Sequence, residues 1–161
     1  MNSAIRRTAL LLCLAVAAPG SAQQIPGPYG PQVTLGQAKA IVAAAQHVAD
    51  ERKFMMAFAV VLPSGETILL EVMDGTQTGS IGVAQAKART AARFRRPTKA
   101  FADSVASGNL GALTLDGVVA VEGGVPIVAS GRVIGALGVS GGTAQQDGEV
   151  AAAALAAVKL P

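Results

Sequence analysis

Six basic side chains and no acidic one lie between Ala84 and Phe101. They are Lys87, Arg89, Arg93, Arg95, Arg96 and Lys99. Such a segment can serve as a nucleic-acid surface, as an anion-binding site, or simply as the solvated end of a helix. These interpretations differ in which side chains point towards the protein interior, so the helical periodicity of the segment is informative.

A helix that advances about 100° per residue gives this segment two faces. The alanines of one side predict the face that packs on the core, and they are Ala84, Ala88 and Ala91. Arg89, Arg93 and Arg96 lie together on the far side, within about 60° of one another. These arginines form either a solvated face or a clamp for ligand carboxylates, beside which Thr98 would supply an oxygen.

Lys87 differs from these arginines because the same periodicity places it within the apolar stripe, near Phe94. Its stem could pack there while the ammonium group reaches solvent. Otherwise Lys87 is a buried cation that needs a carboxylate, either from a ligand or from the protein. The predicted protein partners of a buried Lys87 are the acidic residues Asp74, Glu71 and Glu122.

His47 is the single histidine of the chain, and it points away from the apolar side of its predicted helix. Beside it lies a strip of small residues, Ala40, Ala43 and Ala44. Because a helix that is apolar on both sides is usually covered on both sides, this strip predicts a contact in a homo-oligomer. His47 is then a surface or interface residue, or the available nitrogen ligand for a metal.

The sequence SGGT, at residues 140–143, joins a predicted strand to a predicted helix. Backbone N–H groups of Gly141, Gly142 and Thr143 at such a helix N-terminus can hold an anion. The two glycines could equally serve only to form a tight turn.

Residues 1–22 have the layout of a secretory signal peptide, with two arginines, an apolar run and small residues before Gln23. The apolar run is shorter than the roughly 20 residues that span a membrane, so we expect no stable membrane anchor. We therefore predict a periplasmic or secreted protein, cleaved near Ala22. Cleavage would lower the 13 basic residues to 11, against 10 acidic residues.

The composition of the mature chain argues against two classes of function. A nearly neutral chain with few aromatic residues is unlike most nucleic-acid-binding proteins, so we expect no nucleic-acid partner. The single cysteine, Cys13, lies in the predicted leader, which leaves no thiol for catalysis and no common zinc site. A Ser-His-Asp set would have to use His47 on an outer helix face, whereas carboxylate chemistry by Glu66, Glu71 or Asp74 stays open.

The order of apolar runs and turns predicts one α+β domain, residues 34–161, behind an extended Pro/Gly-rich arm, residues 23–33. Helices are predicted at about 35–53, 80–96 and 98–106 and from 143, with Thr34, Ser80 and Thr143 as caps. Strands are predicted at 56–62 and 67–72, and three more within 116–142.

Four segments carry a resemblance to a known family: MDG (73–75), AKARTAARFRRPT (86–98), GGVPIV (123–128) and IGALGVSGGTAQQD (134–147). Together they resemble the GlcG/HbpS-like proteins, which include heme-binding extracellular proteins and the C-terminal domain of PduO-type corrinoid adenosyltransferases. The resemblance implies a profilin-like five-stranded antiparallel sheet flanked by helices, and commonly a homo-oligomer. The chain departs from the family pattern at Leu62, Glu66 and Val72, where Asp, His and Arg are frequent.

We accordingly predict an exported, oligomeric protein that binds a small anionic ligand, with heme or a related tetrapyrrole as the first candidate. The predicted ligand-binding residues are Lys87, Arg89, Arg93, Arg96, Thr98, Asp74, Gly141, Gly142 and Thr143. His47 is the candidate ligand of heme iron. The alternatives are a non-catalytic accessory subunit of a periplasmic redox system and an uncharacterised enzyme on this scaffold.

Overall fold

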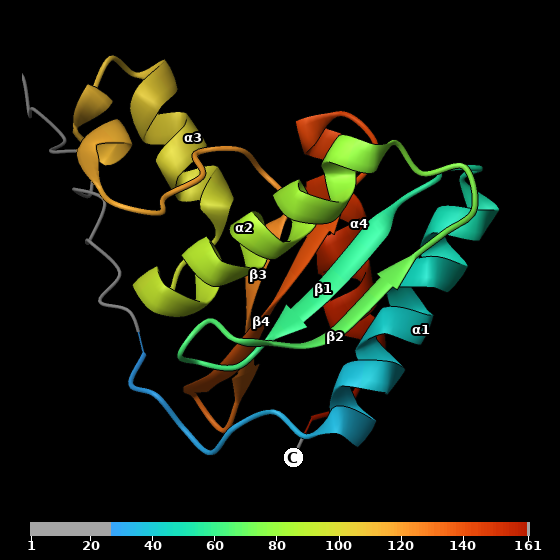
Figure 1. Ribbon diagram of the computed structural model, residues 1–161. Coiled ribbons are helices and arrows are strands. Elements are labelled where there is room, and N and C mark those ends of the chain that lie inside the picture. The colour runs from blue at the N-terminus through green and yellow to red at the C-terminus, as the bar shows by residue number, and fades with distance from the viewer. Residues whose placement is uncertain (1–26, 161) are drawn as a thin grey trace, which may run out of the picture.

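The computed structural model describes residues 27–160, so the predicted leader lies outside the described residues. The chain forms an α+β domain in which helices flank an antiparallel sheet (Figure 1). Its elements are α1 (Leu35–Glu51), β1 (Ala57–Val61), β2 (Thr67–Val72), α2 (Thr78–Phe94), α3 (Thr98–Ala106), the 3-10 helix η1 (Leu110–Thr114), β3 (Gly124–Ala129), β4 (Arg132–Ser140) and α4 (Ala144–Ala157).

The sheet has four strands in the order β2-β1-β4-β3, whereas five were predicted. The missing strand is the expected one at 116–121, which instead runs beside α2. Thr90 of α2 accepts a hydrogen bond from the backbone of Val119 (3.0 Å) and lies 3.2 Å from the carbonyl oxygen of Gly117. Because a helix side chain satisfies these backbone groups, the segment does not need a strand partner.

The described part of the arm, residues 27–33, adds backbone pairing at the start of β4. Tyr29 forms a parallel bridge with Val133, and the Gly30 amide donates to the Val133 carbonyl (2.9 Å). The Tyr29 hydroxyl lies within hydrogen-bond distance of the carbonyl oxygens of Ala92 (3.1 Å) and Arg93 (2.9 Å) at the end of α2. The arm is thus fixed to both the sheet and a helix terminus.

Helices cover both faces of the sheet (Figure 1). The side chains of β1 alternate: Phe58 and Val60 pack in the core formed with α1 and α4, while Ala57, Ala59 and Val61 face α2. This period of two is the expected consequence of strand geometry. The fold therefore has two cores, one on each side of the sheet.

Helix α2 lies unusually close to β4 because both elements use small residues where they cross. A Cβ atom added to Gly138 would lie 2.9 Å from the Cβ of Ala88 and would collide with the Ala84 carbonyl oxygen. Because Gly138 has no side chain and Ala84 and Ala88 have small ones, the helix and strand backbones can approach each other closely. That approach brings the long side chain of Lys87 past the sheet.

The predicted caps Thr34 and Thr143 are confirmed, and each forms a capping box with the glutamine three residues later. The predicted cap Ser80 is wrong, because α2 already begins at Thr78, with Gln77 as its N-cap residue. The Ser80 amide donates to the Gln77 carbonyl (3.0 Å), so Ser80 belongs to the first turn.

Candidate functional site

Lys87 is buried and forms an ion pair with Asp147 of α4. Its ammonium nitrogen lies 2.6 Å from Asp147 Oδ2 and 3.2 Å from the carbonyl oxygen of Val139. The side chains are only 1% and 3% exposed. The inward direction predicted for Lys87 is confirmed, but none of the predicted partners Asp74, Glu71 and Glu122 supplies the carboxylate.

Two glycine pairs, Gly123–Gly124 and Gly141–Gly142, lie beside this ion pair. A Cβ atom on Gly123 would lie 2.9 Å from Lys87 Nζ and 2.8 Å from Asp147 Cβ. Gly142, of the second pair, donates its backbone N–H to Asp147 Oδ1 (2.9 Å). Thr98 is fully buried and accepts a hydrogen bond from the Gly124 amide (2.9 Å), so its oxygen faces the sheet and not the arginines.

The N-terminus of α4 therefore already holds an anion, the carboxylate of Asp147. The Gly142 amide binds Asp147, and the Thr143 amide binds the side chain of Gln146 (2.8 Å). Burial raises the pKa of Asp147 above its ordinary value of 3.8, while the hydrogen bonds from Lys87, Gly142 and Gly141 oppose this rise. These predicted anion-binding amides are occupied by the protein itself.

The three outward arginines do not form one clamp. Arg89 and Arg93 are exposed and donate to the backbone carbonyls of Gly65 (3.3 Å) and Ser64 (3.2 Å), in the turn between β1 and β2. Arg96 lies elsewhere, with its guanidinium 5.6 Å from the ring centre of Phe101. Thus Arg89 and Arg93 hold the hairpin turn, and Arg96 packs on α3.

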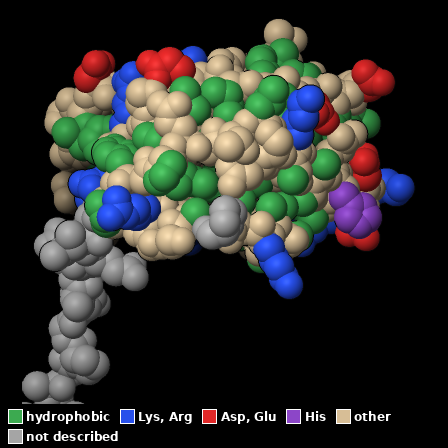
Figure 2. Space-filling view, turned by 90° about the horizontal axis from the view of Figure 1, so that it is seen from below, with side chains coloured by type: hydrophobic (Ala, Val, Ile, Leu, Met, Phe, Trp, Pro, Cys, Tyr) green, Lys and Arg blue, Asp and Glu red, His purple; other side chains and the backbone are tan. Residues whose placement is uncertain are grey.

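His47 stands on the surface, as the histidine in Figure 2 shows beside acidic side chains. Its side chain is 74% exposed, and Nε2 lies 3.6 Å from Glu51 Oε1, one turn further along α1. Among the described residues, no group of three or more His, Cys, Asp or Glu side chains is placed to hold a metal ion.

Two adjoining hollows open where α1 ends, and they share Lys53, Phe54 and Met55. We call them together the methionine cleft. The first hollow, of about 430 Å³, is completed by Gln46, Asp50, Met73 and Asp74. The second hollow, of about 320 Å³, is completed by Gly75, Gln77, Gly141, Gly142 and Gln146.

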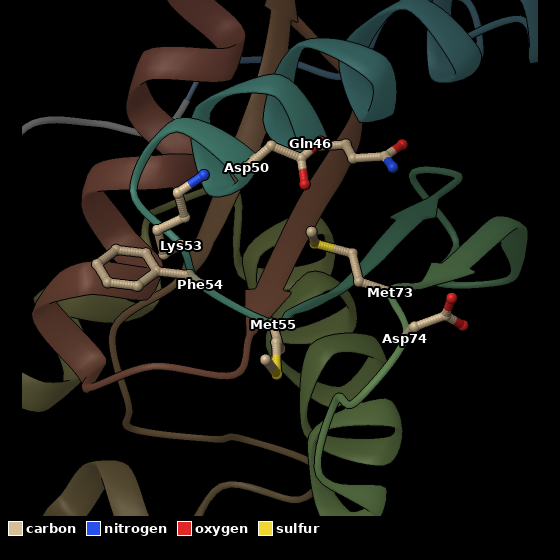
Figure 3. Close-up of a pocket in the computed structure, with 7 residues that line it drawn as sticks. All are labelled: Gln46, Asp50, Lys53, Phe54, Met55, Met73 and Asp74. Atoms are coloured by element: carbon tan, nitrogen blue, oxygen red, sulfur yellow. The ribbon is translucent and has the colours of Figure 1, made fainter.

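The chain turn after α1 directs the side chains of this cleft. Lys53 has a left-handed backbone (φ 59°), and the Phe54 amide donates back to the Ala49 carbonyl (2.9 Å). Figure 3 shows Met73 pointing towards α1, while Met55 points the opposite way. The Met55 sulfur lies over Gly75, 2.8 Å from where a Cβ atom would stand.

The cleft brings together only part of the residues predicted from sequence. Asp74, Gly141 and Gly142 line it, whereas the remaining predicted ligand-binding residues and His47 are not among the side chains that line it. Met55, which was not among the predicted residues, also lines the cleft and is 57% exposed. The burial of Asp147 could have been predicted, because it shares the helical spacing of Val150 and Ala154, which are buried.

Known proteins are similar to this chain in sequence and in fold. The family model described as "Haem degrading protein HbpS-like" matches residues 33–156. The chain belongs to the HbpS-like family. Its relatives include Protein GlcG of Escherichia coli strain K12, which is 40% identical over 64% of this chain and 77% of that protein. An uncharacterised 15.0 kDa protein of Citrobacter freundii is 38% identical over 76% of this chain and 89% of its own length.

Solved structures of HbpS-like proteins also match. HbpS has a TM-score of 0.74 and 26% identity, covering 91% of this chain and 100% of that one. The PduOC:Heme complex has a TM-score of 0.72 and 27% identity, covering 79% and 95%. One relative of this HbpS-like chain has therefore been solved with heme. No helix among residues 27–160 is long and apolar enough to cross a membrane.

Proposed function

We propose that this HbpS-like protein binds heme or a related tetrapyrrole in the methionine cleft. The observation that carries the proposal is the thioether of Met55, which is exposed on the wall of a hollow. The two hollows fall within the usual size range of small-molecule sites, roughly 300–1,000 Å³. The family match and the heme complex of a relative support the same ligand.

The donors of the cleft fit this ligand. A thioether is a known axial ligand of heme iron, so Met55 is the proposed iron ligand, with Met73 in the first hollow as the second candidate. Phe54 and the methionine side chains offer apolar surface to the ring. Among residues 27–160, Lys53 is the one cation that lines both hollows, and no acidic side chain lines the second hollow. We therefore expect a propionate there.

Bound heme would supply redox-active iron, while the residues of the chain would bind and orient it. A hemin titration of the protein without its leader, followed by Soret absorbance, tests the proposal. We expect saturable binding, a weaker and shifted band for Met55→Leu, and weaker affinity for Lys53→Gln. His47→Gln serves as the control and should bind as wild type does. Wild-type protein without a saturable Soret change would refute the proposal.

Degradation of the bound ligand is a second candidate, because the family description names haem degradation. Loaded protein supplied with a reductant and dioxygen would then lose its Soret band and release iron. A stable band under these conditions favours binding alone. An accessory role in a redox system would instead appear as co-purification with a partner protein and no hemin binding.

We also propose export and self-association. The leader-like sequence at residues 1–22 supports export, and intact-mass measurement after expression in a Gram-negative host should show a chain that begins near Gln23. The exposed positions Ala40 and Ala43 on α1 support a homo-oligomer contact on this helix.

A further inference from the structure

We infer that Asp147, held in place by Lys87, is a positioning residue that fixes the Gly141–Gly142 wall of the methionine cleft. Neither side chain lines the cleft, so both would act on a ligand only through the backbone of this wall. The identity of the ligand rests on the proposed function. The positioning of the wall is a property of the ligand-free protein and can be measured separately.

The two carboxylate oxygens of Asp147 accept hydrogen bonds from different groups. Oδ2 accepts from the buried Lys87 ammonium at 2.6 Å, and Oδ1 accepts from the Gly142 amide of the wall at 2.9 Å. Lys87 in turn reaches the Val139 carbonyl (3.2 Å), one residue before the end of β4. The ion pair thus links α2, α4 and the end of β4 to the cleft.

The wall has no side chains with which to anchor itself. A Cβ atom on Gly141 would lie 2.7 Å from Met56 Cα and collide with the Met55 carbonyl oxygen. A Cβ atom on Gly142 would lie 2.7 Å from Gln146 Oε1. At Gly141 only backbone fits, and the carboxylate that accepts the Gly142 amide holds this backbone in position.

A contribution to folding stability does not by itself explain why Lys87 and Asp147 form a buried ion pair. Removing two charges from water is costly, and apolar replacements of buried ion pairs are often neutral or stabilising. An apolar pair in place of Lys87 and Asp147 would, however, leave the Gly142 amide without an acceptor. The acceptor oxygen is therefore the part of this arrangement that the cleft needs.

Two double variants isolate that oxygen. Lys87→Met/Asp147→Asn removes both charges and keeps an acceptor for the Gly142 amide, whereas Lys87→Met/Asp147→Leu removes the acceptor as well. We expect the second variant to bind hemin at least about tenfold more weakly than the first. Thermal unfolding of both variants is measured alongside. Equal affinities of two folded variants would overturn the inference.

Hydrogen exchange of the wild-type amides gives a test that needs neither variant nor ligand. The Gly142 amide should exchange with deuterium as slowly as amides of β4, although it lies in a connecting turn. Exchange at the rate of an unprotected amide would overturn the inference. If wild type binds no hemin, the proposed ligand fails, and this exchange rate alone decides whether the wall is fixed.

Discussion

The Lys87 ammonium lies 2.6 Å from the Asp147 carboxylate, and both side chains are almost completely buried. This contact joins segments 60 residues apart in the sequence. Three of the four segments that carry the family resemblance meet here, because Gly123 and Gly142 enclose the pair and Thr98 holds Gly124 beside it. In this chain, one buried ion pair therefore brings these three segments together.

The single variant Lys87→Met should be strongly destabilised. It leaves the Asp147 carboxylate buried without its cation, which typically costs about 3–5 kcal/mol. Chemical denaturation of wild type and variant measures the loss. Lys99→Met is the matched control, because Lys99 pairs with Asp103 on the surface (2.7 Å) and should leave the midpoint nearly unchanged. Equal midpoints for all three proteins would contradict the burial of Lys87.

The pH dependence of stability should carry the signature of Asp147. Its folded pKa is raised above 3.8 by burial, so the folded state holds this proton more tightly than the unfolded state. The stability that this protonation contributes is fully present below pH 3.8 and is lost as pH rises through the folded pKa of Asp147. The free energy of unfolding of wild type, minus that of Lys87→Met/Asp147→Asn, should therefore fall over this interval. A difference that rises with pH would show a lowered pKa instead.

Gly123→Ala should destabilise the protein, whereas Gly82→Ala should stabilise it. Gly123 has φ 124°, and a Cβ atom there would meet the Val139 carbonyl oxygen at 2.6 Å. The backbone strain alone is of order 1–3 kcal/mol. Gly82 lies in α2 with no atom near its missing side chain, so alanine should add about 0.5–1 kcal/mol. Thermal unfolding measures both changes, and a stable Gly123→Ala would be incompatible with the enclosed pair.

Tyr29→Phe should loosen the arm. The variant loses the hydroxyl that binds the last carbonyls of α2, at a cost of about 0.5–1.5 kcal/mol. Deuterium exchange of the Gly30 amide, which donates to Val133 (2.9 Å), should become faster. Amides of β1 serve as the internal control and should not change. An unaltered Gly30 rate would mean that pairing with β4 alone fixes the arm.

Ala43→Glu should dissociate the proposed homo-oligomer, because a carboxylate would be buried in a contact made of small side chains. Light scattering of the purified protein measures the mass of the assembly. Ala43→Ser is the control, since it keeps the small size and should leave the assembly intact. A wild-type protein that is already monomeric would remove the basis of the proposal.

The sequence by itself determined the α+β class, the four helices and the inward direction of Lys87. Helical and strand periodicities are local properties, and the capping residues Thr34 and Thr143 mark helix starts through contacts three residues away. The same periodicity would have placed Asp147 on a buried face. It could not have paired Asp147 with Lys87, because spacing along one helix carries no information about another.

Only the tertiary structure decided which polar groups remain available to a ligand. Helix α2 crosses β4 closely enough for Lys87 to reach Asp147, so the predicted anion site at residues 141–143 is filled by the protein's own carboxylate. The segment predicted as the fifth strand instead hydrogen-bonds to the hydroxyl of Thr90 at residues 117 and 119. Met55 is left exposed because the turn at Lys53 directs it away from the core, an outcome set by packing and not by the apolar character of its side chain.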